Sequence, residues 1–147
     1  MTEPLAFLPQ RRHDNGSVTV IHTFVEHHGD RAIIVTSLGQ KRYLSAMKHA
    51  EAVLGNSSSG IVEAPAFGVP TVNTGDRQRG RIRAESVLDC AEDRDAITKT
   101  IEIAVSPAFR KQIRGADYPF GKPGATRSIL KHLKQTSLDN LLMKRFH

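Results

Sequence analysis

The sequence predicts an α/β fold in which helices cover a doubly wound parallel sheet. Along most of the 147 residues, short β-branched or apolar runs alternate with segments whose apolar residues recur at helical spacing. Strands separated by helices of this length pair in parallel through right-handed crossovers. A Gly/Ser turn at residues 55–60 links one predicted strand to the next helix. The length is typical of one domain with its own core, so we expect a single domain over residues 1–147.

The first 50 residues predict two strands and two helices. Residues 4–9 are a short apolar run typical of a buried strand. Residues 17–28 carry apolar side chains at helical spacing and end before Gly29. The β-branched run at 32–37 predicts a second strand, and residues 40–50 return to a helical period. This order is the beginning of a β-α-β-α pattern.

The same alternation continues to the end of the chain. We expect further strands at residues 52–54, 70–73 and 86–89. We expect helices at residues 59–67, 93–105, 106–114, 124–135 and 138–146, with a Gly/Pro-rich loop at 115–124. The segment at 138–146 is the expected carboxyl-terminal helix. No internal repeat interrupts the pattern.

The composition indicates a soluble, cytoplasmic protein. The single cysteine, Cys90, excludes a disulfide framework and fits a reducing compartment. The apolar stretch near Met1 is short and interrupted by Pro4 and Pro9, which argues against a signal peptide, and no later run is long enough to span a bilayer. No cysteine or acidic pair lies at metal-ligand spacing from the neighbouring residues 27–28, both histidine. We therefore expect no membrane association, no metal and no cofactor.

The formal net charge of +6 indicates an anionic partner, which could be nucleic acid, a membrane surface or a phosphorylated small molecule. Basic residues gather at 11–12, at 77–83 and in the last seventeen residues. Aromatic residues make up 5% of the chain, tryptophan is absent, and no arginine cluster is interleaved with aromatic side chains. Because nucleic-acid binding usually needs aromatic stacking platforms or a recognised helical motif, we disfavour a nucleic-acid partner.

The segment from Asn56 to Gly60 carries the clearest chemical signal. Its three serines lie where a strand ends and a helix begins, so their hydroxyls can cap the helix or bind phosphate oxygens at the positive end of the helix dipole. Spacing alone leaves both readings open. The segment has neither the Gly-Lys-Ser/Thr ending of a P-loop nor a G-x-G-x-x-G fingerprint. Asn56 also replaces the first glycine of a nucleophile elbow around Ser58.

Two charged residues beyond this segment are candidates for ligand binding. Glu63 lies near the start of the predicted helix, where a carboxylate can accept the two hydroxyls of a ribose; compensation of the helix dipole and simple exposure are the alternatives. Arg77 follows Gly75 just beyond a predicted strand, at the edge where open α/β sheets bind ligands. An arginine at this edge can pair bidentately with phosphate.

These residues form part of a longer ordered set of motifs. The motifs are Tyr-Leu-Ser at 43–45, Gly-Asn-Ser-Ser-Ser-Gly-Ile at 55–61, Glu-Ala-Pro at 63–65, the Phe-Gly-Val-Pro segment at 67–73, Gly-Asp-Arg-Gln-Arg-Gly-Arg at 75–81, the segment at 83–87, Tyr-Pro-Phe-Gly at 118–121 and Lys-Arg-Phe at 144–146. In this order they closely resemble the hydrolysing UDP-N-acetylglucosamine 2-epimerases, the branch that feeds sialic-acid and related nonulosonic-acid synthesis. The resemblance spans most of the chain.

The resemblance implies a Rossmann-like fold similar to the carboxyl-terminal domain of a two-Rossmann-domain (GT-B type) enzyme, with the active site between the two halves. It implies that Ser57 and Ser58 bind the phosphates of UDP, that Glu63 holds the ribose hydroxyls and that Arg77 contacts the nucleotide. Gly60 would permit a close approach of the backbone. Further candidates for the same site are Ser59, Arg81 and Arg11.

The resemblance also implies a reaction and a missing part. In this family UDP is eliminated from a UDP-N-acetylhexosamine to leave a 2-acetamidoglucal, and addition of water or UDP gives the product inverted at C2. The amino-terminal half supplies most of the acid/base carboxylates, so the catalytic residues are not assigned here and we expect no turnover by this chain alone. The expected partners are UDP or a UDP-sugar, together with an amino-terminal domain or a second copy. The alternative is a non-catalytic nucleotide-binding or self-association module.

Overall fold

A parallel three-stranded sheet lies at the centre of the computed structural model, which describes residues 15–121 and 123–137. The strands are β1 (Val53–Gly55), β2 (Thr71–Thr74) and β3 (Val87–Cys90), paired in that order. Thr71 of β2 is in register with both Val53 and Val87. The predicted α/β class and parallel pairing are confirmed.

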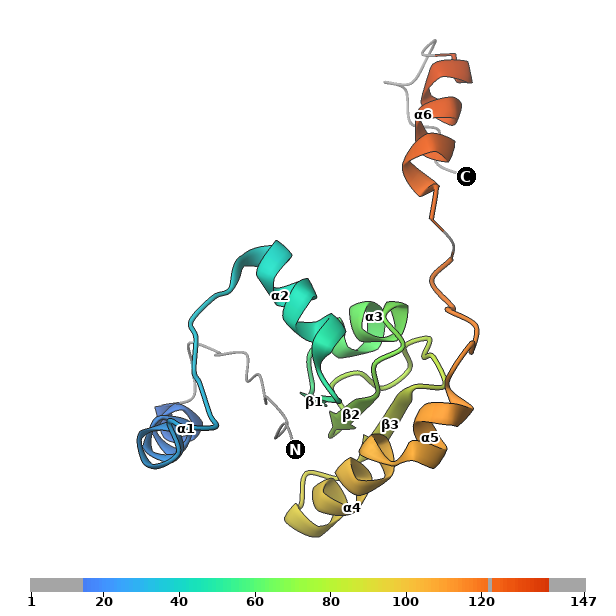
Figure 1. Cartoon of the computed structure of the whole chain (residues 1–147). Helices are drawn as coiled ribbons and strands as arrows, with labels where there is room; N and C mark the ends of the chain where they lie inside the picture. The colour runs from blue at the N-terminus through green and yellow to red at the C-terminus, as the bar shows by residue number, and fades with distance from the viewer. Residues whose placement is uncertain (1–14, 122, 138–147) are drawn as a thin grey trace, which may run out of the picture.

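Helices cover the two faces of this sheet. The described helices are α1 (Asn15–His27), α2 (Gly39–His49), α3 (Ser58–Ala66), α4 (Arg94–Val105), α5 (Pro107–Gln112) and α6 (Ala125–Gln135). Figure 1 shows α2 and α3 on one side of the sheet and α4 and α5 on the other. α3 packs against all three strands, and α4 packs against β2 and β3. Helices on both faces are the arrangement of a doubly wound sheet.

Capping residues explain where several helices begin. The side chain of Ser57 accepts a hydrogen bond from the amide of Ser59 at the start of α3, and that of Asp93 accepts one from Ala96 at the start of α4. Ser106 caps α5 in the same way, and Pro107 at its first turn costs no intrahelical hydrogen bond. Polar caps therefore fix where these helices begin, and α3 and α4 begin shortly after strands β1 and β3.

The core lies between the sheet and the helices that cover it. Ile61 of α3 and Val72 of β2 have no exposed surface. The other buried apolar residues are Met47, Ala64, Val69, Ala84, Ala104, Phe109 and Ile113. Among the described residues, none of the helices combines the length and the apolar character needed to cross a bilayer.

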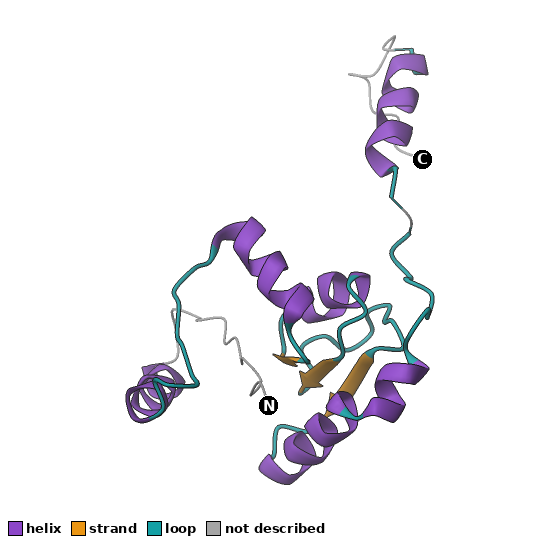
Figure 2. Ribbon diagram, in the orientation of Figure 1, coloured by secondary structure: helices purple, strands orange, loops and turns teal. Residues whose placement is uncertain are grey.

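The predicted strand at residues 32–37 is wrong. In the structure this segment is an irregular connection between α1 and α2, drawn as a loop in Figure 2, and Ile33 is 52% exposed. A strand needs a hydrogen-bonded neighbour, and β1 pairs only with β2 among the described residues. β-branched residues supply the propensity for a strand but not its partner. The predicted strand at 4–9 and helix at 138–146 lie outside the described residues.

Candidate functional site

Three connecting segments meet at the carboxyl edge of the sheet. Because the strands are parallel, the residues after Gly55, Thr74 and Cys90 all leave the sheet at this edge. α3 begins just after β1, an arginine-rich loop of residues 75–83 follows β2, and α4 begins after β3. Open α/β sheets bind ligands at this edge. The predicted site residues Ser57, Ser58 and Arg77 belong to the first two segments.

The amino terminus of α3 combines a capping serine with an exposed one. Ser57 has extended backbone angles (φ −79°, ψ 143°), and its hydroxyl lies 3.3 Å from the amide nitrogen of Ser59. The capping reading of this segment is therefore confirmed for Ser57. Ser58, the first helical residue, is exposed at the positive end of the helix dipole. A hydroxyl and backbone amides in this position suit an anionic ligand.

A line of hydroxyls runs from α2 to Glu63. The hydroxyl of Tyr43 lies 2.8 Å from that of Ser59, which in turn donates a hydrogen bond to the Glu63 carboxylate. All three side chains are partly buried. The Glu63 carboxylate therefore has a hydrogen-bond partner within α3, one helical turn before it in the chain. Ser59 and Glu63 were predicted as separate site residues, and no local pattern indicated that Tyr43 connects to them.

The structure accounts for Gly60 through helix packing. Gly60 is buried in α3, and a Cβ atom built at this position would lie 2.8 Å from the methyl carbon of the Thr71 side chain in β2. The Thr71 hydroxyl also donates a hydrogen bond to the Gly60 carbonyl at 2.8 Å. The small residue therefore lets α3 lie close against the sheet. A role for Gly60 in contact with a ligand stays a prediction.

One buried side chain joins the arginine-rich loop to the segment before α3. The Gln78 amide nitrogen donates to the Asn56 carbonyl at 2.7 Å. Asn56 directly precedes Ser57, and Gln78 directly follows the exposed Arg77. The contact therefore brings the Arg77 segment beside the amino terminus of α3. The sequence offered no sign of it, because Gln78 lies between charged residues and resembles a surface residue.

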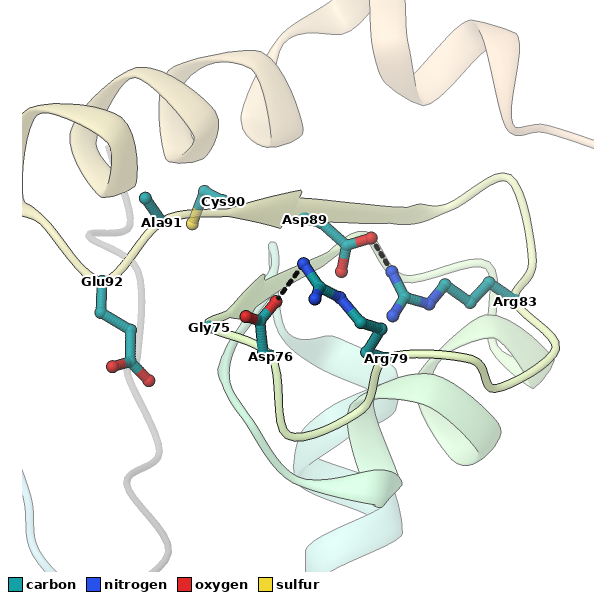
Figure 3. Close-up of a pocket in the computed structure, with 8 residues that line it drawn as sticks. All are labelled: Gly75, Asp76, Arg79, Arg83, Asp89, Cys90, Ala91 and Glu92. Atoms are coloured by element: carbon teal, nitrogen blue, oxygen red, sulfur yellow. Dashed lines mark ion pairs between the residues drawn. The ribbon is translucent and has the colours of Figure 1, made fainter.

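Two ion pairs, one within this loop and one between the loop and β3, form a cluster (Figure 3). The Arg83 guanidinium pairs with the Asp89 carboxylate of β3, which also accepts a hydrogen bond from the buried Asn73 side chain at 2.7 Å. Arg79 and Asp76 pair at 3.1 Å, with both side chains more than three-quarters exposed. The cluster borders a cavity of about 680 Å³, lined by Gly75, Asp76, Arg79, Arg83, Asp89, Cys90, Ala91 and Glu92.

Two further predicted site residues are Arg81 and Arg11. Arg81 is exposed at the end of the arginine-rich loop, and its amide donates to the Gln78 carbonyl at 3.3 Å. Arg11 lies outside the described residues. Within residues 15–121 and 123–137, no group of three or more histidine, cysteine or acidic side chains is arranged to hold a metal ion. The candidate groups at the starts of α3 and of the arginine-rich loop are hydroxyls, helix amides and arginine, which suit an anion.

Comparison with known proteins supplies a family for this arrangement. Residues 6–134 match the family described as UDP-N-acetylglucosamine 2-epimerase. Over 145 residues the chain is 34% identical to GDP/UDP-N,N'-diacetylbacillosamine 2-epimerase (hydrolyzing) of Campylobacter jejuni. The aligned region covers 97% of this chain and 37% of that protein. The chain thus spans little more than a third of the length of this relative.

Solved structures agree with the fold. The crystal structure of UDP-GlcNAc 2-epimerase from Neisseria meningitidis bound to UDP-GlcNAc matches with a TM-score of 0.67 at 16% identity, over 87% of this chain and 35% of the other. The S. aureus MnaA–UDP co-structure matches with a TM-score of 0.64 at 21% identity, over 83% of this chain and 34% of the other. At this identity the likeness establishes the fold alone, in which this chain corresponds to about a third of the larger molecule.

Proposed function

Because this chain belongs to the UDP-N-acetylglucosamine 2-epimerase family, we propose that it forms the UDP-binding part of a hydrolysing UDP-sugar 2-epimerase. In this proposal residues 1–147 make one Rossmann-like domain, equivalent to the carboxyl-terminal half of a GT-B type enzyme. The ligand is a UDP-N-acetylhexosamine, whose sugar is inverted at C2 as UDP leaves. The chain spans 37% of the length of its Campylobacter jejuni relative, and in this proposal the reaction takes place only when this part is combined with the amino-terminal half of such an enzyme.

The observation that carries the proposal is the contact between Gln78 and Asn56. It brings the exposed Arg77 segment and the amino terminus of α3 to one edge of the sheet, as a site formed by both segments needs. Ser57 and Ser58 are proposed to hold the two phosphates with the first amides of α3, and Arg77 to approach them from the β2 side. A helix amino terminus and a guanidinium both stabilise the negative charge that grows on a departing diphosphate.

The hydrogen bond from Ser59 supports a ribose-binding role for Glu63. Ser59 holds one carboxylate oxygen, and Tyr43 holds the Ser59 hydroxyl. A carboxylate fixed in this way keeps its other oxygen available for a diol. We propose that this oxygen accepts hydrogen bonds from the ribose hydroxyls while the phosphates lie at the start of the same helix.

Calorimetric titration with UDP tests the proposal. We expect the folded chain to bind UDP but not uridine, because the diphosphate supplies the charge that α3 and Arg77 recognise. Arg77→Ala should weaken binding about tenfold, the usual effect of removing one hydrogen bond to a charged group. Arg114→Ala, at an exposed arginine after α5, serves as the matched control and should leave the affinity unchanged.

Two results would overturn the proposal. One is the absence of binding by the folded chain at about 1 mM UDP, a concentration that detects even weak nucleotide binding. The other is equal loss of affinity in Arg77→Ala and Arg114→Ala, which would mean that the overall positive charge, and not the predicted site, attracts the ligand.

A further inference from the structure

Gln78 is a buried residue within an exposed loop. Its relative exposure is 2%, whereas Asp76, Arg77 and Arg79 around it are exposed. Its side-chain amide nitrogen reaches 22 positions back along the chain to the carbonyl of Asn56. One side chain thus ties the loop after β2 to the residue that precedes the cap of α3.

Packing alone does not account for a glutamine at this position. The Gln78 Oε1 atom is buried and has no hydrogen-bond partner among the described residues. An apolar side chain of similar size would fill the same space without burying an unpaired oxygen, which is costly. What an apolar side chain could not provide is the amide hydrogen bond to Asn56.

The backbone of Gln78 makes a second contact that holds the loop. Its carbonyl accepts a hydrogen bond from the Arg83 guanidinium at 2.9 Å, and Arg83 also pairs with Asp89 of β3. The side chain of Gln78 is attached to the segment after β1, its backbone follows β2, and Arg83 links it to β3. Gln78 therefore connects all three strands of the sheet at the edge where the candidate site lies.

We propose that Gln78 is a positioning residue that fixes Arg77 beside the amino terminus of α3. The proposal rests on the function proposed above, because it assigns to Gln78 the task of holding the arginine that contacts the diphosphate. Arg77 is exposed and directly bonded to Gln78, so the position of its backbone depends on the Asn56 contact. A donor held in place before binding loses less conformational freedom when the anion arrives.

Limited trypsin digestion of the full 147-residue chain tests the positioning without any ligand. Trypsin cleaves after arginine, and the exposed arginines of the loop are Arg77, Arg79 and Arg81. Gln78→Met keeps the side-chain length but removes the amide. We expect several-fold faster cleavage after these three arginines in Gln78→Met, while cleavage after Lys99 in α4 stays at the wild-type rate.

The matched control is Gln112→Met, at an exposed glutamine at the end of α5. It should leave loop cleavage unchanged. Unchanged loop cleavage in Gln78→Met, or an equal increase at Lys99, would overturn the proposal, because the first result means that the contact does not order the loop and the second means that it stabilises the whole fold. If Gln78→Met does not fold, Gln78→Asn withdraws the same amide by one methylene and takes its place in both tests.

A double-mutant cycle with UDP gives the second readout. Arg77→Ala should weaken binding about tenfold in the wild-type chain but less than about threefold in Gln78→Met, because the arginine is then no longer held in place. Equal factors in both backgrounds would overturn the proposal. If the wild-type chain binds no UDP, the proposed function fails, whereas the proteolysis result still decides whether Gln78 orders the loop.

Discussion

Helices α3 and α6 are similar in length but meet the rest of the described chain differently. α3 buries Ile61 and Ala64 against the sheet. α6 buries no residue and leaves Ile129 and Leu133 57% and 64% exposed, and Figure 1 shows it standing away from the sheet. Both helices carry apolar residues on one face. The apolar pattern therefore predicts a helix in both places, but burial also requires a surface on which to pack.

The largest expected effect comes from shortening one isoleucine in each helix. Ile61→Ala removes a side chain with no exposed surface and should lower the free energy of unfolding by about 2–5 kcal/mol. Ile129→Ala, the matched control on α6, should change it by less than about 0.5 kcal/mol. Urea unfolding of the two variants measures both values. Equal losses would mean that α6 packs as tightly as α3, which would remove the contrast between them.

The same contrast explains which parts of the fold could be predicted from the sequence. Apolar periodicity located α3, and the serines before it indicated its cap at Ser57. These features depend on residues near one another in the sequence. Residues 32–37 have the composition of a strand but lack a hydrogen-bonded neighbour among the described residues, so the local pattern gave a wrong prediction.

The contacts that build the candidate site show the same limit. The serines, Glu63 and Arg77 were singled out by residue type and spacing. The hydrogen bonds from Gln78 to Asn56 and from Tyr43 to Ser59 span 22 and 16 positions. No local pattern specifies such pairs, because they depend on how parallel strands and their helices pack. The sequence thus indicated the chemical groups but not the side chains that hold them.

A second prediction extends the comparison from apolar residues to charges. Asp89→Ala removes the partner of Arg83 and leaves the buried Asn73 amide without its acceptor, so it should lower stability by about 1–3 kcal/mol. Asp76→Ala breaks an exposed pair with Arg79 and should lower stability by about 0–1 kcal/mol. Thermal and urea unfolding measure the difference. A larger loss of stability in Asp76→Ala than in Asp89→Ala would show that the exposure of an ion pair does not determine how much it stabilises this fold.

The smallest expected effect lies at the contact between α2 and α3. Tyr43→Phe removes the hydroxyl that meets Ser59 at 2.8 Å, and Tyr118→Phe removes one that donates to the Val62 carbonyl of the same helix at 3.0 Å. Each substitution deletes one hydroxyl contact to α3 and keeps the ring, so each should lower the free energy of unfolding by about 0.5–1.5 kcal/mol. In stability the two variants should be nearly equal.

Binding should separate these two variants. In Tyr43→Phe the Ser59 hydroxyl loses one partner and can turn away from the Glu63 carboxylate, so UDP affinity should fall by about threefold. Tyr118→Phe does not touch this line of hydroxyls and should bind UDP like the wild type. Calorimetry on both variants gives the answer. Equal affinities would mean that Glu63 is oriented without Tyr43, and that α2 contributes to the packing of α3 but not to its ligand.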